Sequence, residues 1–364
     1  MKSNYLPITS VATIINGGTP KTSIPDYWDG NIPWLSVKDF NNDSKFVYST
    51  EKHITELGLK NSSTNLLKAD DIIISARGTV GKLAMIPFNM TFNQSCFGIR
   101  ADIEKILPHY LYYALKNNIQ TIKGSTHGSV FDTITLKDFD IIKINVPDLE
   151  TQKKIVRILS AFDQKIELNN QQSKTLFELG RQLYIKKFEN NDTVDKIELG
   201  NFFPVVTGKK DANASSENGE YPFFTCSKTI NKIDDYTFDS SAILLAGNGD
   251  FNVKFYRGKF DAYQRTYVLI PNNPKYLGFL YWAISYNLPK ITANYRGSVI
   301  KFITKGNIEE FKIPFADNKF IPVFMKYLEK IEKNDQDNET LAEIRDILLL
   351  KLISGKINLE NIES

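Results

Sequence analysis

An internal repeat of about half the chain length constrains the fold more than any other feature of the sequence. The repeated segments are IIISARGTVGKLAMI and FNQSCFGI in the first half, and AILLAGNGDFNVKFY and YQRTYVLI in the second. Ala76 aligns with Ala246, and Gln94 aligns with Gln264, both at an offset of 170. Self-similarity on this scale predicts two copies of one structural unit.

The repeat extends toward the N-terminus at a different offset. SVATIINGGTP resembles GNFFPVVTGKK, which sets Gly17 opposite Gly208 at an offset of 191. Because the offset falls by about twenty between the two blocks, we expect the first copy to carry extra residues between Lys38 and Ala69.

Each copy is predicted to be a β-rich globule with one internal helix. Runs such as DIIISA and RTYVLIP are short, rich in β-branched residues and bounded by turn formers, which is typical of strands. Helical spacing of apolar residues in 109–118 and 276–287 predicts the internal helices. A short strand then ends each globule at Pro147 or Pro314. The predicted fold class is α+β, with each repeated globule followed by a long helix.

The long helices follow from a change of period after each proline. Apolar residues recur at four-three-four spacing from Thr151 and predict an amphipathic helix at about 151–188 that is apolar, then polar, then apolar. The second copy repeats this pattern around NDQDN at 334–338, with Gly355 as the expected stop. A helix of about 38 residues spans roughly 57 Å, which is too long to pack wholly on its own globule.

We therefore predict that the two helices pair as an antiparallel coiled coil. In the alternative, each helix caps its own sheet and breaks at its polar middle. The residues expected to form the helix pair are Ile155, Leu159, Phe162, Ile166, Leu176, Leu183, Leu328, Ile331, Leu341 and Leu348. The expected boundaries are 1–149 for the first globule, 150–190 for the first helix, 191–318 for the second globule and 319–358 for the second helix.

Charge, cysteine content and hydropathy exclude several protein classes. Lys and Arg total 45 against 42 Asp and Glu, so the net charge of +3 gives no basic tail, and any basic surface must be local. The two cysteines, Cys96 and Cys226, are too few for a disulfide framework and wrongly spaced for a zinc site. The N-terminal segment lacks a signal-peptide core, and no apolar run is long enough for a membrane helix. We expect a cytoplasmic protein without membrane contact.

The sequence contains no recognised catalytic or cofactor motif. ARGTVGK lacks the spacing and the Ser or Thr of a P-loop, and LAGNGDFN has Asn252 where a dinucleotide fingerprint needs its last glycine. The three histidines are isolated, and no serine lies in a GxSxG elbow. We therefore expect a non-catalytic chain that binds neither a metal nor a cofactor of its own.

Polar, glycine-bearing loops are the remaining candidates for function, because basic side chains and bare backbone amides suit contact with DNA. Arg77 and Lys82 flank two glycines, and the second half repeats the frame. Plain turns would give the same pattern, and the tryptophans are expected in the core rather than against bases. The candidate DNA-binding residues are Lys38, Arg77, Gly78, Thr79, Lys82, Gln94, Thr126, His127, Ser129, Lys209, Lys210, Asn248, Lys254, Arg257, Gln264, Arg265, Arg296 and Ser298.

With these pieces assembled, the sequence resembles the specificity subunit of a type I restriction-modification system over nearly its whole length. The segments that carry the resemblance are GGTP, PWLSVKDF, DIIISARGTVGKLAMI, FNQSCFGI, the helical region from VPDLETQKKI to YIKKF, AGNGD, GKFDAYQRTYVL and LLLKLISGKI. One departure is DNKFIPVFMKYL, which lacks the acidic residue and glutamine of LETQKKI, so the pattern leaves the start of the second helix open.

The resemblance implies two target recognition domains, each of which reads one half of a split sequence in double-stranded DNA. It also implies that the paired helices fix the half-site spacing and dock two methyltransferase subunits, to which restriction subunits are added. The methyltransferase subunits would hold AdoMet and methylate adenine N6. The alternatives are the recognition subunit of another methylating restriction complex, a stand-alone DNA-mimic or anti-restriction scaffold, and an enzyme with an unrecognised site.

Overall fold

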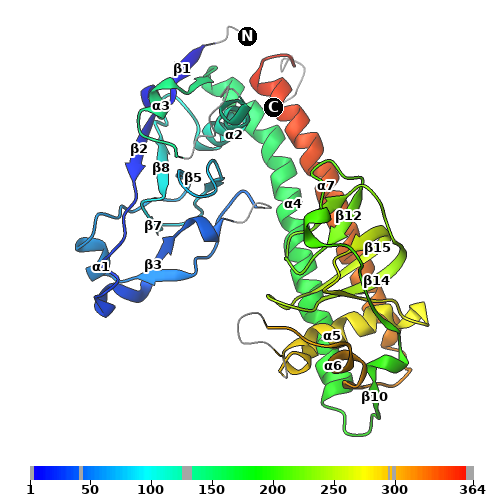
Figure 1. Ribbon diagram of the computed structural model, residues 1–364. Helices are drawn as coiled ribbons and strands as arrows, with labels where there is room; N and C mark the ends of the chain where they lie inside the picture. Colours follow the sequence, from blue (N-terminus) through cyan, green and yellow to red (C-terminus); the bar gives the residue numbers. More distant parts are fainter. Residues whose placement is uncertain (1–3, 41–43, 125–132, 294–295, 297–300, 358–364) are drawn as a thin grey trace. The chain divides into compact units, whose positions relative to one another are not determined.

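The computed structural model describes residues 4–40, 44–124, 133–293, 296 and 301–357 (Figure 1). The chain divides into two compact units, which are residues 1–168 with 337–364, called unit 1, and residues 169–336, called unit 2. Each unit contains one repeat globule together with half of each long helix. The predicted α+β class with two globules is confirmed.

Unit 1 is built on a four-stranded antiparallel sheet. Its order is β2-β8-β5-β6, and a three-stranded sheet, β4-β3-β7, and a two-stranded sheet, β1-β9, lie in the same unit. The strands are β1 (Tyr5–Pro7), β2 (Ala12–Asn16), β3 (Trp28–Leu35), β4 (Lys52–Ile54), β5 (Ile72–Ser75), β6 (Leu83–Met85), β7 (Thr91–Phe92), β8 (Cys96–Ala101) and β9 (Lys143–Asn145). The helices before the long one are α1 (Glu56–Lys60), α2 (Pro108–Gly124) and α3 (Asp138–Ile141).

Unit 2 joins the corresponding strands into one six-stranded sheet, of order β11-β16-β14-β15-β12-β13, beside the small sheet β10-β17. The strands are β10 (Lys196–Glu198), β11 (Val205–Thr207), β12 (Tyr221–Phe224), β13 (Asn231–Ile233), β14 (Phe238–Ala246), β15 (Val253–Ala262), β16 (Thr266–Leu269) and β17 (Lys312–Pro314). Its helices before the long one are α5 (Leu277–Ile291) and α6 (Lys305–Glu309). Residues 109–118 and 276–287 therefore lie in or at the start of helices, as predicted.

Strand register confirms the repeat and corrects one alignment. In β5 the pairing runs from Ile72 with Ile99 to Ser75 with Cys96, and in β14 it runs from Ile243 with Leu269 to Ala246 with Thr266. Ala246 is therefore the counterpart of Ser75, and the alignment with Ala76 is wrong by one residue. The loop between β5 and β6 covers residues 76–82, one residue more than the loop at 247–252, and this extra residue explains the shift.

The extra residues of the first copy lie where the changing offset predicts them. Pro33 pairs with His53 in the first copy and Pro222 pairs with Lys232 in the second, so the offset is 189 at the prolines and 179 at their partners. The offset falls to 171 at Ile72, in β5. The insertions therefore lie between β3 and β4 and between β4 and β5, on the flank of the sheet rather than in its centre.

A proline accounts for the split sheet of unit 1. Strand β6 ends at Met85, two residues before Pro87, and β7 resumes at Thr91. In unit 2 the matching strand β15 runs through Arg257 and Gly258, opposite Ser241 and Ser240, without a break. Because proline has no N–H to donate to the ladder, the first copy cannot continue the strand at this point.

The long helices are α4 (Leu149–Tyr184) and α7 (Ile321–Ile353), and each is continuous through its polar middle. The break expected by the alternative interpretation is absent from both. Asp148 starts α4 by accepting hydrogen bonds from the backbone N–H and hydroxyl of Thr151, at 2.9 and 2.8 Å. Gly355, with φ of 70°, follows the end of α7 as predicted.

The two long helices begin with different residues because a buried glutamine anchors the first helix only. Gln152 is fully buried, and its side chain bonds the carbonyls of Lys105 and Pro147 and the N–H of Leu107. Ile321 holds the corresponding first-turn position of α7 and packs in an apolar cluster instead. The first turn of α4 is therefore held by hydrogen bonds and that of α7 by apolar packing, which is why the LETQKKI motif does not recur.

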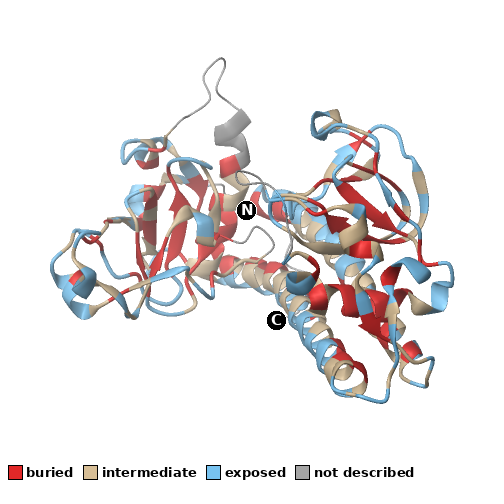
Figure 2. Cartoon of the chain, turned by 60° about the horizontal axis from the view of Figure 1, so that its bottom comes forward, coloured by how far each residue is buried: buried red, intermediate tan, exposed pale blue. Residues whose placement is uncertain are grey.

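Within each unit, α4 and α7 belong to the same core. Figure 2 marks buried residues in red, and they lie on the strands and on patches of the helices. In unit 1, Ile155 and Leu159 of α4 share an apolar cluster with Leu349, Leu352 and Ile353 of α7. In unit 2, Tyr184 at the end of α4 clusters with Phe324 and Leu328 of α7. Of the residues predicted to pair, Ile155, Leu159, Ile166 and Leu328 are buried, and Phe162, Leu176, Leu183, Ile331, Leu341 and Leu348 are half-buried.

The polar middle contributes a direct link between the helices in unit 2. Asn334 of α7 is fully buried and donates from Nδ2 to the carbonyl of Asn169, to Gln172 Oε1 and to Ser173 Oγ of α4, at 3.2, 3.1 and 3.0 Å. A buried amide that must find polar partners resists displacement of one helix along the other.

Gly180 of α4 is required by the tryptophan of α5. A Cβ at Gly180 would lie 2.3 Å from the ring of Trp282, which is buried and donates its indole N–H to the carbonyl of Phe177 at 2.8 Å. Trp34 and Trp282 are core residues, as expected, and Trp28 is half-buried.

We predict that Gly180→Ala lowers the free energy of unfolding by about 1 to 3 kcal/mol, because overpacking exceeds the gain in helix propensity. Gly306→Ala is the matched control, since the nearest atom to its added Cβ is a Glu310 carboxylate oxygen 3.4 Å away. Thermal unfolding of both variants measures the difference. Equal melting temperatures would contradict the predicted collision.

Candidate nucleic-acid interface

One edge of the sheet in each unit gathers the glycine-bearing loops. In unit 1 this edge, called loop edge 1, consists of residues 17–19, 76–82, 93–95 and 133–134. The N–H of Ala76 donates to the carbonyl of Ser95 at 2.7 Å, and its carbonyl accepts from Ile134 at 2.9 Å. Gly18 N–H reaches the carbonyl of Phe92 at 2.9 Å. Segments from four parts of the sequence therefore meet through backbone hydrogen bonds.

Unit 2 repeats the same construction in loop edge 2, which consists of residues 208–211, 247–252, 263–265, 296 and 301–303. Gly247 takes the part of Ala76, since its N–H donates to the carbonyl of Arg265 at 2.8 Å and its carbonyl accepts from Ile303 at 3.0 Å. Arg77 forms a β-bridge with Thr133, and Asn248 forms one with Phe302. Arg77 and Asn248 are therefore equivalent positions on two copies of one scaffold.

The next residue in each loop is a glycine that turns the chain outward. Gly78 has φ of 76° and Gly249 has φ of 67°, and an added Cβ would meet no atom within 4 Å at either position. Glycine is therefore required at these positions by the left-handed backbone conformation and not by steric crowding. Both loop tips present bare backbone to the surroundings, which allows a large ligand to approach closely.

A side-chain hydrogen bond joins two loops at each of the predicted glutamines, although the two glutamines use different atoms. Thr19 donates its hydroxyl proton to Gln94 Oε1 in loop edge 1. Gln264 donates from Nε2 to Asp211 Oδ1 at 2.7 Å in loop edge 2. Thr19 and Asp211 were not among the predicted residues, although both closely follow the aligned glycines, Gly17 and Gly208, and that alignment is the signal that could have identified them.

The exposed predicted residues fall mainly on these two edges. Lys38 lies in the turn after β3, whose last carbonyl, on Leu35, accepts from Asn93. The exposed members of the predicted set are Lys38, Arg77, Gly78, Thr79, Gln94, Lys209, Arg257, Gln264, Arg265 and Arg296, while Lys82, Lys210, Asn248 and Lys254 are half-buried. Thr126, His127, Ser129 and Ser298 lie outside the described residues.

Two predicted cations point to partners within the protein. Lys254 Nζ donates to the carbonyl of Ser227 at 2.6 Å and to Asn252 Oδ1 at 2.5 Å, and burial lowers the pKa of this lysine. Arg257 lies in β15, and its guanidinium is 3.7 Å from the carboxylate of Glu332 on α7. The structure thus gives Lys254 a role in closing loop edge 2 and Arg257 a role in holding the sheet to α7.

The described residues contain no group of three or more His, Cys, Asp or Glu side chains placed to hold a metal ion. Burial raises the pKa of Cys96 to about 12, which keeps its thiol protonated. Across the same residues, no helix combines the length and apolar character needed to cross a bilayer.

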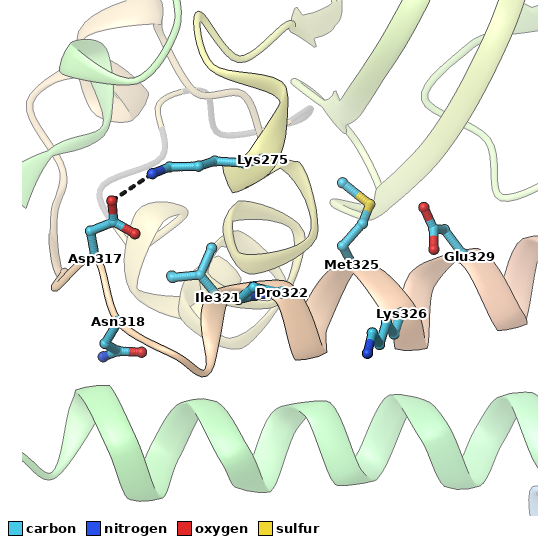
Figure 3. Close-up of a pocket in the computed structure, with 8 residues that line it drawn as sticks. All are labelled: Lys275, Asp317, Asn318, Ile321, Pro322, Met325, Lys326 and Glu329. Carbon is cyan, nitrogen blue, oxygen red and sulfur yellow. Dashed lines mark hydrogen bonds and ion pairs between the residues drawn. The ribbon is translucent and has the colours of Figure 1, made fainter.

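A surface depression of about 400 Å³ lies at the start of α7 (Figure 3). Ile321, Pro322 and Met325 supply its apolar lining, and Lys275 pairs with Asp317 at 2.5 Å beside it. Lys275 follows β16 at the end opposite to Thr266, so this depression belongs to the other end of that strand from loop edge 2.

We predict that Lys254→Met lowers the melting temperature, because each lost hydrogen bond contributes about 1 kcal/mol to stability. Lys209→Met, at an exposed lysine of loop edge 2, is expected to leave the melting temperature unchanged. Calorimetry of the two purified variants makes the comparison. A fully stable Lys254→Met protein would show that this ammonium group does not hold the loop.

The chain matches known proteins in both repeats. A family model described as a type I restriction modification DNA specificity domain matches residues 2–178 and 191–344. The chain is 42% identical over 166 residues to the type I restriction enzyme EcoDI specificity subunit of Escherichia coli, a match that covers 46% of this chain and 33% of that protein. It is 27% identical over 408 residues to the type I restriction enzyme MjaIX specificity subunit of Methanocaldococcus jannaschii, which covers 98% of this chain and 93% of that protein.

The fold also has a counterpart among solved structures. The crystal structure of the type I restriction-modification S subunit from M. genitalium superposes with a TM-score of 0.57 at 18% identity, covering 97% of this chain and 96% of that one. At this identity the likeness concerns the fold. Because the family model covers both repeats and most of the residues, the chain belongs to the family of type I restriction-modification DNA specificity subunits.

Proposed function

We propose that this chain is the DNA-reading subunit of a type I restriction-modification enzyme and that it binds a split site through two recognition domains. The domains would be residues 1–149 and 191–318, joined by helices at 150–190 and 319–358. The observation that carries the proposal is the recurrence of one loop edge in both units, with the same backbone hydrogen bonds at Ala76 and Gly247.

The chemistry of the loop edges suits DNA. Exposed Arg77, Arg265 and Arg296 can pair with phosphates or with guanine, while Gly78 and Gly249 let the backbone approach the duplex. At the equivalent position, one half-site would meet Arg77 and the other would meet Asn248. Arginine suits guanine and asparagine suits adenine, so the two domains would favour different bases there. We therefore assign Arg77 and Asn248 the central place in half-site discrimination.

The two long helices would act as the spacer between the domains by pairing as an antiparallel coiled coil. Two polar contacts support this pairing, namely Asn334 with Ser173 in unit 2 and Arg345 with Asp163 in unit 1. The second contact lies ten residues before the first along α4, from Ser173 to Asp163. Along α7 it lies eleven residues after the first, from Asn334 to Arg345. Nearly equal steps of opposite sense are what an antiparallel register requires.

The catalytic work would belong to partner subunits. Two methyltransferase subunits docked on the helices would hold AdoMet and methylate adenine N6, and restriction subunits would complete the complex in the cytoplasm. The support for this division of labour is membership of a family whose named relatives are specificity subunits.

We predict that Arg77→Ala weakens DNA binding by about 1 to 3 kcal/mol if the arginine reads a base, and lowers the salt slope by about one unit if it meets only phosphate. Binding titrations of the complex at several salt concentrations separate these outcomes. Lys105→Ala is the matched control, since Lys105 follows Ala101, at the end of β8 opposite to Cys96 and the loop. Unchanged affinity and slope in the Arg77 variant would remove Arg77 from the interface.

We also predict that Leu159→Asp or Leu348→Asp disrupts the helix pair and with it the assembly with the methyltransferase subunits, because a carboxylate would enter the apolar contact. Leu168→Asp is the control, because Leu168 lies on the same helix as Leu159 with 61% of its surface exposed. Size-exclusion chromatography of the co-expressed subunits reports assembly. Normal complexes from both variants would argue against pairing of the helices.

A further inference from the structure

A buried charge cluster joins the first globule to both long helices within unit 1. The carboxylate of Asp163, on α4, is 2.7 Å from the guanidinium of Arg345 on α7 and 3.6 Å from the ammonium of Lys45. It also accepts the phenolic proton of Tyr113 on α2. The side chains of Lys45, Asp163 and Arg345 are only 6, 9 and 14% exposed.

Lys45 belongs to the globule and not to the helices. Its carbonyl accepts from the N–H of Met85 at 2.8 Å, so its segment runs beside the outer strand β6. Its ammonium group also donates to the hydroxyl of Tyr113 at 3.0 Å and lies 2.9 Å from His109 Nδ1. A single carboxylate thus holds the sheet flank, α2 and α7 against α4.

The second repeat carries a counterpart of this link. Glu332 on α7 is equivalent to Asp163 on α4. The alignment of the two helices follows from their buried residues, because Ile155 and Leu159 of α4 correspond to Phe324 and Leu328 of α7. Its carboxylate forms an ion pair with Arg257 of β15. The exposed fractions of the two side chains are 44% for the arginine and 21% for the glutamate.

The first copy has Pro87 at the position of Arg257, and Lys45 comes from the segment inserted between β3 and β4. The acid recurs at an equivalent position while the cation has a different origin, so the link is kept although the sequence around it has changed.

We propose that Asp163 is a positioning residue that fixes the orientation of the first recognition domain on its helix and thereby the spacing at which the chain accepts two half-sites. Glu332 is the weaker counterpart for the second domain. This inference rests on the proposed function, because spacing has meaning only for a split site.

A charged cluster suits this role better than apolar contact alone. Apolar side chains accept small rotations and slides with little change in buried area, whereas a buried carboxylate must keep its hydrogen-bond partners at fixed positions. Burial lowers the pKa of Lys45 to about 8, with Asp163 opposing the shift, so the lysine is mainly charged at pH 7.

The test uses the complex of the full chain with its methyltransferase subunits at pH 7. Duplexes carry the two half-sites identified by methylation mapping, with the native spacer or with one base pair more or less. For the unaltered protein we expect the native spacer to be preferred by about tenfold or more. A changed spacer misplaces one half-site, which should cost at least as much as the roughly tenfold penalty of one mismatched base pair. For Asp163→Asn we expect the preference to fall to about threefold or less on the same scale.

Two further variants separate positioning from plain stability. Lys45→Met leaves the Asp163 and Arg345 pair in place; it is expected to reduce spacer preference and also to lower the melting temperature, because its ammonium hydrogen bonds are lost. Leu111→Ala removes a fully buried side chain of α2 outside the charge cluster, so it is expected to lower the melting temperature without changing the preference.

An unchanged preference in both Asp163→Asn and Lys45→Met would overturn the positioning role and leave the proposed function standing. Equal binding of all spacers by the unaltered protein would overturn the proposed function, and the positioning role with it.

Discussion

The central strand of each sheet is the element on which the loop edges depend. Strand β5 is buried along its whole length, and so is β14 from Ala242 to Ala246, because neighbouring strands and apolar clusters cover both faces. Each strand is fixed by pairing on both sides, with β8 and β6 in one unit and with β16 and β15 in the other. Strand β5 ends at Ser75 and β14 at Ala246, so Arg77 and Asn248, each two residues beyond the strand end, hold equivalent positions.

This rigidity lets the two copies differ in side chains without differing in frame. The first loop closes through the hydroxyl of Ser75, which bonds the carbonyl of Thr79 and the N–H of Lys82. The second closes through Asn252 and Lys254. The backbone hydrogen bonds that hold each loop against its neighbours are nevertheless the same. A scaffold that tolerates such exchange can present different side chains to two different half-sites.

Periodicity and the repeat predicted the fold well, because both reflect burial, which leaves a regular mark on the sequence. The long helices, the internal helices and the insertion before β5 all follow from spacing alone. The one-residue error at Ala76 arose because a turn can gain a residue without changing the hydrophobic pattern around it. The links made by Lys45, Asp163 and Gln152 were not predicted, since contacts between distant positions leave no local pattern.

The candidate site was predicted only in outline for the same reason. Glycines that require a left-handed backbone mark the loop tips, so Gly78 could be identified from sequence. Which cation faces outward depends on the partners nearby, and those partners come from other segments. Lys254 and Arg265 look alike in sequence, yet Lys254 bonds the carbonyl of Ser227 and the side chain of Asn252, whereas Arg265 is exposed.

The central claim is that two copies of one loop edge read the two halves of a split DNA site. Base-resolution mapping of adenine methylation in cells that carry this chain and its methyltransferase subunits tests it most directly. The account predicts a split motif with methyladenine on opposite strands of its two halves, and predicts that this methylation disappears when the chain is deleted. Methylation that is absent, or that persists without the chain, would contradict it.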